Sequence, residues 1–286
     1  MKKKVIIVYE KSNKIGFGHY SRSLRLKKKL IDKFEVKLCE LKNTKYLIKK
    51  IIKDKFDLHI FDLKNYSKEI EKLENVIIFE DTKKKLKDVL SINPLDLNLK
   101  NSGPKYFLYP KSFNKSKKFD YSKKELNILI VQGRNDSNNQ LKKIVNFLIS
   151  NINKIKFNFK IYIKVKDKIK VKNSKSIKNL PNFKDEFEIY KDIDFAISGV
   201  GNTSFELGYL GIPAIHYSIE KREIVRAKIF EKLKLAPYIK PEKLSLIIKE
   251  LNKLYIDDNY RKKIINKRLK FFRKKNHIEK LINEII

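Results

Sequence analysis

Short apolar runs alternate with longer amphipathic segments along most of the 286-residue chain. The runs at residues 4–9, 58–63 and 127–131 have the length of single strands, and apolar residues at helical spacing follow them. Strands separated by helices of about ten residues are typical of βαβ units, in which the strands are parallel. The alternation therefore predicts an α/β fold with parallel sheets.

The alternation is interrupted once and then resumes. Residues 113–126 are polar and rich in lysine and serine, a composition typical of a connecting segment. We therefore predict two Rossmann-like domains, residues 1–115 and 126–286, joined by a linker at 116–125. Ligands of such folds bind at the carboxyl ends of parallel strands, so we expect the two sheets to face a central cleft.

The net charge of +35 with a pI near 9.9 makes nucleic acid a partner to consider. The 60 lysines greatly outnumber the 8 arginines and are spread over almost every predicted helix and loop. Sites that bind phosphates and read bases favour arginine with interleaved aromatic residues, and the sequence has no such patch. We therefore expect no specific nucleic-acid partner. Part of the lysine excess could attract an anionic ligand or an anionic membrane surface.

The single cysteine, Cys39, excludes a disulfide framework, and no group of Cys and His residues has the spacing of a zinc site. The apolar run after the basic start is four residues long, too short for a signal peptide or a membrane span. These features predict a cytoplasmic protein that needs neither a metal nor a cofactor. They do not predict its oligomeric state.

Glycine is rare, and its few positions are informative. It occurs at Gly16, Gly18, Gly103, Gly133, Gly199, Gly201, Gly208 and Gly211. These eight residues fall in four short stretches. Other residues replace glycine poorly where φ is positive or where a ligand approaches the backbone closely. We therefore expect the functional residues in these stretches.

The first stretch, GFGHYSR at residues 16–22, lies between a predicted strand and a predicted helix. It is a poor dinucleotide fingerprint, because Ser21 stands where the third glycine should be. It could be an ordinary helix start made of permissive glycines. It could also be a catalytic site, since the positive end of a helix favours the neutral imidazole of His19, which suits a general base. Arg22 could then pair with a phosphate or a carboxylate.

The second stretch, SGVGNTSFE at residues 198–206, also joins a strand to a helix. Backbone N–H groups and hydroxyls at a helix N-terminus form an anion site that suits a diphosphate. A carboxylate inside that helix can hold the vicinal hydroxyls of a ribose. The candidate residues are Gly199, Gly201, Asn202, Thr203, Ser204 and Glu206. The alternative is a plain glycine-rich turn, with Glu206 as a partner of the helix dipole.

A third stretch, QGRNDSNNQ, follows the strand at residues 127–131. Gly133, Arg134, Asp136 and Asn139 could line a site at the end of that strand. Asp136 or Asn139 could equally be the N-cap of the helix that follows.

Taken in chain order, the motifs resemble one family. They are GxGHxxR, GPxYxLxP, Gly-x-x-Asp-x-x-Asn, GxGxTSxE and LGIP, and they span roughly residues 4–235. This order resembles the UDP-2,4-diacetamido-2,4,6-trideoxy-β-L-altropyranose hydrolases of pseudaminic acid biosynthesis. Those enzymes share the GT-B architecture of the MurG-type glycosyltransferases. Arg134 departs from the pattern, because the family has a second glycine at that position.

The resemblance implies roles for the candidate residues. His19 would activate water, the stretch from Gly199 to Glu206 would hold UDP with Glu206 on the ribose, and Gly133, Asp136 and Asn139 would line the cleft. The implied function is hydrolysis of a UDP-linked diacetamido-trideoxyhexose to UDP and free sugar for nonulosonic acid synthesis. The alternative is a GT-B glycosyltransferase that uses a UDP-sugar for surface polysaccharide or glycan synthesis. A third hypothesis is a non-catalytic protein that binds polyanions through its positive charge.

Overall fold

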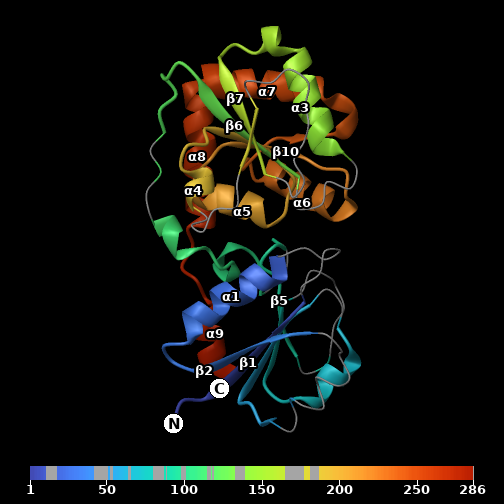
Figure 1. Ribbon diagram of the computed structural model, residues 1–286, viewed down its shortest axis with the longest axis vertical. Coiled ribbons are helices and arrows are strands. Elements are labelled where there is room, and N and C mark those ends of the chain that lie inside the picture. Colours follow the sequence, from blue (N-terminus) through green and yellow to red (C-terminus); the bar gives the residue numbers. More distant parts are fainter. Residues whose placement is uncertain are drawn as a thin grey trace. The chain divides into compact units, whose positions relative to one another are not determined.

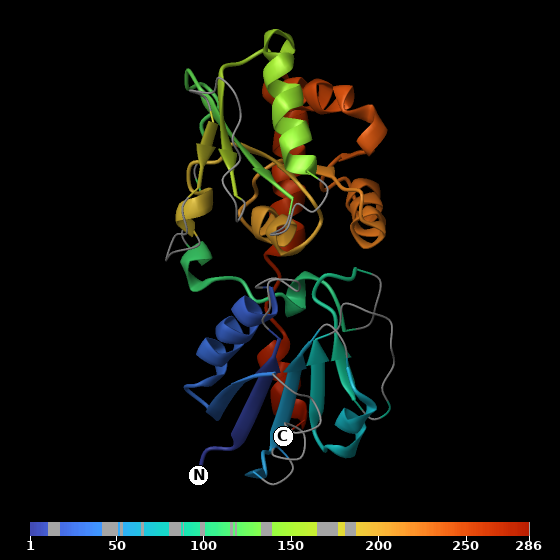
Figure 2. The same cartoon turned by 45° about the vertical axis from the view of Figure 1, so that its right-hand side comes forward.

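The computed structural model describes residues 1–10, 18–41, 51, 54–63, 66–79, 87, 89–97, 101–114, 117, 119–132, 139–164, 177–180 and 187–285. They form two compact units, each with its own parallel sheet and its own helices (Figure 1 and Figure 2). Unit 1 consists of Met1–Tyr109 and Lys275–Ile286, and unit 2 consists of Pro110–Lys274. The predicted α/β class with two Rossmann-like domains is confirmed.

Within the described residues, unit 1 has five parallel strands in the order β2-β1-β3-β4-β5. They are β1 (Lys4–Tyr9), β2 (Glu35–Glu40), β3 (Leu58–Asp62), β4 (Val76–Phe79) and β5 (Leu90–Ile92). The central strands β1 and β3 are buried almost throughout, as expected of parallel strands that are covered on both faces. Because β1 and β3 are parallel neighbours, the chain leaves both strands at the same edge of the sheet.

Two helices, α1 (Gly18–Leu30) and α9 (Ile278–Ile285), pack on one face of this sheet. Their apolar side chains meet those of alternate strand residues; this cluster includes Val5, Ile7, Leu26, Leu30, Ile278 and Ile282. The intervening strand residues face the other side, where a 3₁₀ turn at Lys68–Lys72 buries Ile70. This division follows from the alternation of side chains along a strand.

The described part of unit 2 has six parallel strands in the order β11-β10-β9-β6-β7-β8. They are β6 (Leu126–Val131), β7 (Phe159–Ile163), β8 (Ile177–Asn179), β9 (Phe195–Ser198), β10 (Ala214–Tyr217) and β11 (Tyr238–Ile239). The central strands β6, β9 and β10 contribute residues that are almost completely buried. The carboxyl ends of these three strands therefore lie side by side at one edge.

The helices of unit 2 are α3 (Gln140–Ser150), α4 (Phe187–Tyr190), α5 (Asn202–Tyr209), α6 (Lys221–Lys232), α7 (Ser245–Ile256) and α8 (Asp258–Phe272). α3 and α7 bury apolar faces in the main core of the unit, together with alternate residues of β6 and β7. α8 lies so close to α5 that a Cβ atom added at Gly208 would be 2.2 Å from the Phe272 ring. Glycine at this position is therefore required by helix packing.

The units differ from the predicted domains 1–115 and 126–286 in two respects. The predicted linker at 116–125 does not connect the units, since its described residues belong to unit 2. There, the Tyr121 ring stacks on Phe195 at 5.4 Å between centroids and lies 4.1 Å from the Arg261 guanidinium carbon. These aromatic contacts explain why a polar stretch is part of a folded unit.

The second difference is at the C-terminal end of the sequence. The chain returns to unit 1 at Lys275, so residues 275–286 are not part of unit 2. Two hydrogen bonds hold residues 276 and 277 to unit 1: the His277 amide donates to the Lys105 carbonyl at 2.8 Å, and the Asn276 side chain donates to the Phe107 carbonyl at 3.0 Å. The apolar face of α9 then completes the core of unit 1.

Candidate functional site

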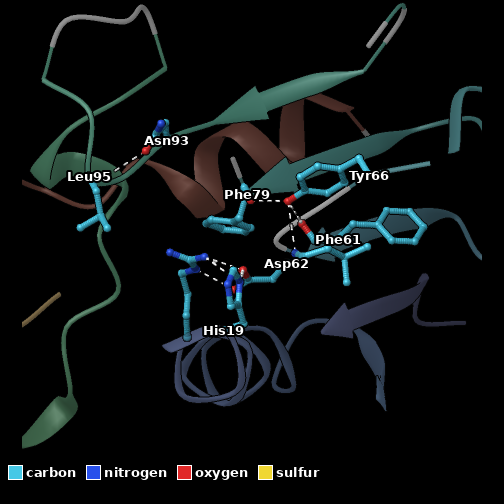
Figure 3. A network of polar contacts seen from close by, with 9 residues as sticks. His19, Phe61, Asp62, Tyr66, Phe79, Asn93 and Leu95 are labelled. Atoms are coloured by element: carbon cyan, nitrogen blue, oxygen red, sulfur yellow. Dashed lines mark hydrogen bonds and ion pairs between the residues drawn. The ribbon is translucent and has the colours of Figure 1, made fainter. Parts of the chain in front are cut away.

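The first candidate site lies in unit 1, at the carboxyl ends of β1 and β3. The last residues of these strands, Tyr9 and Asp62, are partners in the parallel register. The chain enters α1 at Gly18, and this places His19 and Arg22 in the first two turns of the helix. A strand end and a helix start thereby bring three ionisable side chains to one edge of the sheet (Figure 3).

Asp62 accepts hydrogen bonds from both of these helix residues. The His19 Nδ1 atom lies 2.5 Å from Asp62 Oδ1, and Arg22 Nε donates to Asp62 Oδ2 at 2.6 Å. The Nη2 atom of Arg22 donates to Asp62 Oδ1 as well, so the guanidinium and the carboxylate form a bidentate pair. The Asp62 side chain is 1% exposed, whereas those of His19 and Arg22 are 15% and 12% exposed.

The surroundings of Asp62 keep its carboxyl ionised. Burial by itself would raise its pKa, but the charge and hydrogen bonds of Arg22, together with those of His19, outweigh burial and hold the pKa below its usual value. An ionised carboxylate can only accept hydrogen bonds, so the ring proton of a neutral His19 lies on Nδ1. The other ring nitrogen, Nε2, then carries the lone pair. This is the arrangement of a general base that a carboxylate orients.

Aromatic residues hold the other side of this group. The Arg22 guanidinium carbon lies 5.2 Å from the centre of the Phe79 ring, at the end of β4. The Tyr66 hydroxyl donates to the Phe79 carbonyl and accepts a hydrogen bond from the Leu63 amide at 3.2 Å. Tyr66 thus joins the end of β4 to the residue that follows Asp62 at the end of β3 (Figure 3). The His19–Asp62–Arg22 group is therefore fixed from two strands and one helix.

The sequence analysis named His19, Gly18 and Arg22 here but gave Asp62 no role. Gly18 is the first residue of α1, and Gly16 lies outside the described residues. Arg22 pairs with a carboxylate, one of the two partners expected for it, and that carboxylate belongs to the protein itself. The signal for Asp62 was an acid at the end of the wholly buried run LHIFD.

The second candidate site lies in unit 2, where β9 passes into α5. A tight segment, Ser198 to Gly201, joins the two elements, and the first residues of α5 are Asn202 and Thr203. We call this segment the glycine turn. It lies at the carboxyl edge of the sheet, because β9 is a central parallel strand between β6 and β10.

The two glycines of the turn are needed for different reasons. A Cβ atom at Gly199 would lie 2.4 Å from Oε2 of Glu223, so this glycine makes room for a carboxylate of α6. At Gly201, φ is −119° and a Cβ atom would meet nothing nearer than 3.8 Å. Neither backbone conformation nor packing within the described chain requires glycine at 201. Its missing side chain leaves the backbone at the N-terminus of α5 without a covering Cβ atom.

The first turn of α5 holds the other predicted residues. Asn202 and Thr203 are half-buried, whereas Ser204 points inward and its hydroxyl donates to the Gly201 carbonyl at 2.7 Å. Ser204 therefore braces the glycine turn from inside. Glu206 is 6% exposed, and its Oε2 accepts a hydrogen bond from the Tyr190 hydroxyl at 2.6 Å.

Glu223 is a residue of this site that the sequence analysis did not consider. It lies in the first turn of α6, and the Ser218 hydroxyl donates to its Oε2 at 2.6 Å. One helical turn later, Arg226 donates to the Val200 carbonyl at 3.3 Å. The glycine turn is thus held between α5 and the start of α6. No residue pattern indicates this contact, because it depends on the adjacency of β9 and β10.

The third predicted stretch is only partly described. Gly133, Arg134 and Asp136 lie outside the described residues. Asn139 precedes α3 in the left-handed conformation, with φ of 52°, and its side chain makes no capping hydrogen bond. This finding is against Asn139 as the side-chain cap of the helix.

Two kinds of feature are absent from the described residues. They contain no cluster of three His, Cys, Asp or Glu side chains with the geometry of a metal site. None of the helices in this part of the chain has the length and apolar character needed to span a bilayer.

Comparison with solved structures identifies the architecture. Similar structures include the spinosyn forosaminyltransferase SpnP, with a TM-score of 0.69 and 10% identity, and MurG of Acinetobacter baumannii, with 0.64 and 14%. The spinosyn rhamnosyltransferase SpnG, complexed with thymidine diphosphate, matches with a TM-score of 0.65 and 10% identity. Each alignment covers 99% of this chain and 99% of the other. The chain has the GT-B fold.

The predicted GT-B architecture is therefore confirmed. No protein-family model matches the sequence, and no curated protein matches it either. At 10–14% identity the structural likeness establishes the GT-B fold and leaves the reaction open. Two of the three neighbours named above, SpnP and SpnG, are glycosyltransferases by name.

Proposed function

We propose that the chain is a glycosyltransferase that uses a nucleotide-sugar donor. Unit 2 binds the nucleotide diphosphate of the donor at the glycine turn, and unit 1 supplies the general base, His19. The observation that carries the proposal is the hydrogen bond from His19 to the buried, ionised Asp62, in a chain with the GT-B fold. The glycosyltransferase alternative of the sequence analysis takes precedence over the hydrolase, because SpnP and SpnG, two structures with the same fold, are named as glycosyltransferases.

His19 acts on the nucleophile. Its Nε2 removes the proton from an acceptor hydroxyl while that oxygen attacks the anomeric carbon of the donor sugar. The imidazolium that forms is stabilised by the Asp62 carboxylate, which Arg22 keeps ionised. A positioned general base typically contributes a factor of about 10² to 10⁴ in rate.

The glycine turn acts on the leaving group. The bond between the anomeric carbon and the diphosphate breaks, and negative charge grows on the departing diphosphate. Backbone N–H groups and the positive end of α5 stabilise that charge. Gly201 supports this assignment, because no contact within the described chain requires a glycine there.

Hydrolysis of a UDP-sugar is the second candidate, and the order of the sequence motifs favours it. The same base would then take its proton from water, and the products would be UDP and the free sugar. Both reactions need His19 and the glycine turn. They differ only in the group that attacks, so the presence of an acceptor decides between them.

The test measures nucleotide release from a panel of UDP- and TDP-sugars, first in water alone and then with candidate acceptor glycans. A transferase releases nucleotide rapidly only when an acceptor is present, and the sugar appears on that acceptor. Rapid release in water, with stoichiometric free sugar, would identify the hydrolase. Absence of nucleotide binding across the panel would refute both candidates.

A matched pair of glycine variants tests the nucleotide site. Gly201→Ala should fold normally, because a Cβ atom fits there, yet weaken UDP binding about tenfold or more by covering the backbone. The control is Gly103→Ala in unit 1, where φ is +84° and the expected effect is loss of stability. Unchanged UDP affinity in Gly201→Ala would remove the glycine turn from the proposal.

A further inference from the structure

A buried tyrosine is hydrogen-bonded to Glu206, the carboxylate that the sequence analysis expects on the ribose of the nucleotide. Tyr190, the last residue of α4, is 0% exposed, and its hydroxyl lies 2.6 Å from Glu206 Oε2. The two residues come from different helices, α4 and α5 (Figure 1). The bond is therefore a tertiary contact between two helices of unit 2.

Glu206 is correctly placed to reach a ligand at the N-terminus of α5. Side chains on a helix lean toward its N-terminus, so a long residue lies over the residues three and four positions before it. For Glu206 these residues are Thr203 and Asn202, the half-buried first residues of the helix. A nucleoside whose diphosphate binds the glycine turn would have its ribose within reach of this carboxylate.

The hydrogen bond from Tyr190 has two effects on the Glu206 carboxylate. Burial disfavours a charged carboxylate, and a donated hydrogen bond offsets part of that cost. The bond also restricts the rotation of a long, flexible side chain. A carboxylate has about four lone-pair sites, so a bond from Tyr190 is compatible with further donors on the same group. Vicinal ribose hydroxyls are donors of this kind.

Tyr190 is itself held firmly. Its ring packs edge-on against Phe113, with 5.7 Å between the centroids and an interplanar angle of 89°. Phe113 is 1% exposed and lies in the short 3₁₀ turn at the start of unit 2. The tyrosine hydroxyl is therefore a fixed point from which the Glu206 carboxylate is oriented.

We propose that Tyr190 is the positioning residue that orients the Glu206 carboxylate toward the ribose hydroxyls of the nucleotide. The inference rests on the proposed function, because it requires a nucleotide at α5. The inference attributes tighter binding of a ribonucleotide than of a deoxyribonucleotide to Tyr190 and Glu206 together, and not to Glu206 alone. A purely structural Tyr190 would affect stability and would leave this preference unchanged.

The experiment measures dissociation constants for UDP and 2′-deoxy-UDP by calorimetry on the full chain. We expect the unaltered protein to bind UDP about tenfold more tightly, as one hydrogen bond to a charged group provides. Tyr190→Phe, which removes only the hydroxyl, should reduce that preference to about threefold or less. Glu206→Gln should reduce it similarly. Tyr217→Phe is the matched control, because Tyr217 is also buried and donates to Gln140 at 3.1 Å.

The outcomes separate the inference from the proposed function. Loss of preference in Tyr190→Phe, with the preference intact in Tyr217→Phe, supports the positioning role. A tenfold preference retained in Tyr190→Phe overturns it, and so does an unaltered protein that binds UDP and its 2′-deoxy form equally. An unaltered protein that binds neither nucleotide refutes the proposed function, and the inference with it.

Discussion

His216 gives unit 2 a stability that depends on pH. Its side chain is completely buried in β10, where the ring packs edge-on against Phe230 at 5.0 Å between centroids. Burial, together with the nearby charge of Arg268, lowers the pKa of the imidazole from 6.5 to about 3, against a smaller opposing effect of the Ser198 carbonyl. The folded protein therefore holds a neutral imidazole down to low pH, whereas the unfolded chain takes up a proton below pH 6.5.

The sign and the size of the effect follow from proton linkage. Below pH 6.5 the unfolded state binds more protons than the folded state, so acid favours unfolding. Stability is complete above that pH and falls by about 1.4 kcal/mol per pH unit until the folded pKa is reached. At pH 5 the unfolding free energy of unit 2 should be about 2 kcal/mol smaller than at pH 7.

The assay is a urea titration at pH 7 and at pH 5, followed by hydrogen-exchange mass spectrometry of peptides that cover β9 and β10. His216 is the only one of the four histidines that falls in unit 2. Asp194 works in the opposite direction, because burial raises the pKa of its carboxyl. The variant His216→Asn removes the titrating ring and leaves Asp194 unchanged, so the difference between the two proteins isolates the histidine.

A loss of stability between pH 7 and pH 5 that is equal in both proteins would refute this reasoning. It would mean that the acid sensitivity of unit 2 comes from carboxyl groups.

Two further substitutions test the proposed base and the packing of α5. Asp62→Asn should lower turnover about 10²-fold or more, because His19 loses the carboxylate that orients it, while UDP affinity changes less than twofold. Steady-state rates measure the turnover and calorimetry measures the affinity. Unchanged turnover would exclude His19 and Asp62 from catalysis. Gly208→Ala should destabilise unit 2 by about 2 kcal/mol, because the overlap of the new Cβ atom with Phe272 outweighs the gain of about 1 kcal/mol in helix propensity. Urea unfolding measures the change in the free energy of unfolding. A stabilised variant would refute the argument from the overlap.

Much of the fold could be predicted from local patterns. The strand Lys4–Tyr9 was predicted with its observed bounds, because a continuous apolar run of this length suits a covered parallel strand. The expectation of helices of about ten residues between the strands was less reliable, since Lys68–Lys72, between β3 and β4, forms a 3₁₀ turn. A short segment of that kind buries one residue, Ile70, and has no length over which to establish a helix.

The candidate site was only half visible in the sequence. His19 was marked by its glycines and by its place before a helix. Asp62 is 43 residues further along the chain, and only the adjacency of β1 and β3 brings it to His19. Glu223 was missed for the same reason, because the order of strands in unit 2 places α6 beside the glycine turn. Strand order is a property of the assembled sheet, and no local pattern contains it.

The return of the chain to unit 1 determines the order in which the two units can finish folding during synthesis. Residues 278–285 supply Ile278 and Ile282 to the core of unit 1, yet they are synthesised after all of unit 2. Unit 2 is one continuous segment, inserted between the two parts of unit 1. During translation unit 2 can therefore finish folding first, while the core of unit 1 still lacks the side chains of α9. Expression of residues 1–109 alone should give an incompletely folded product.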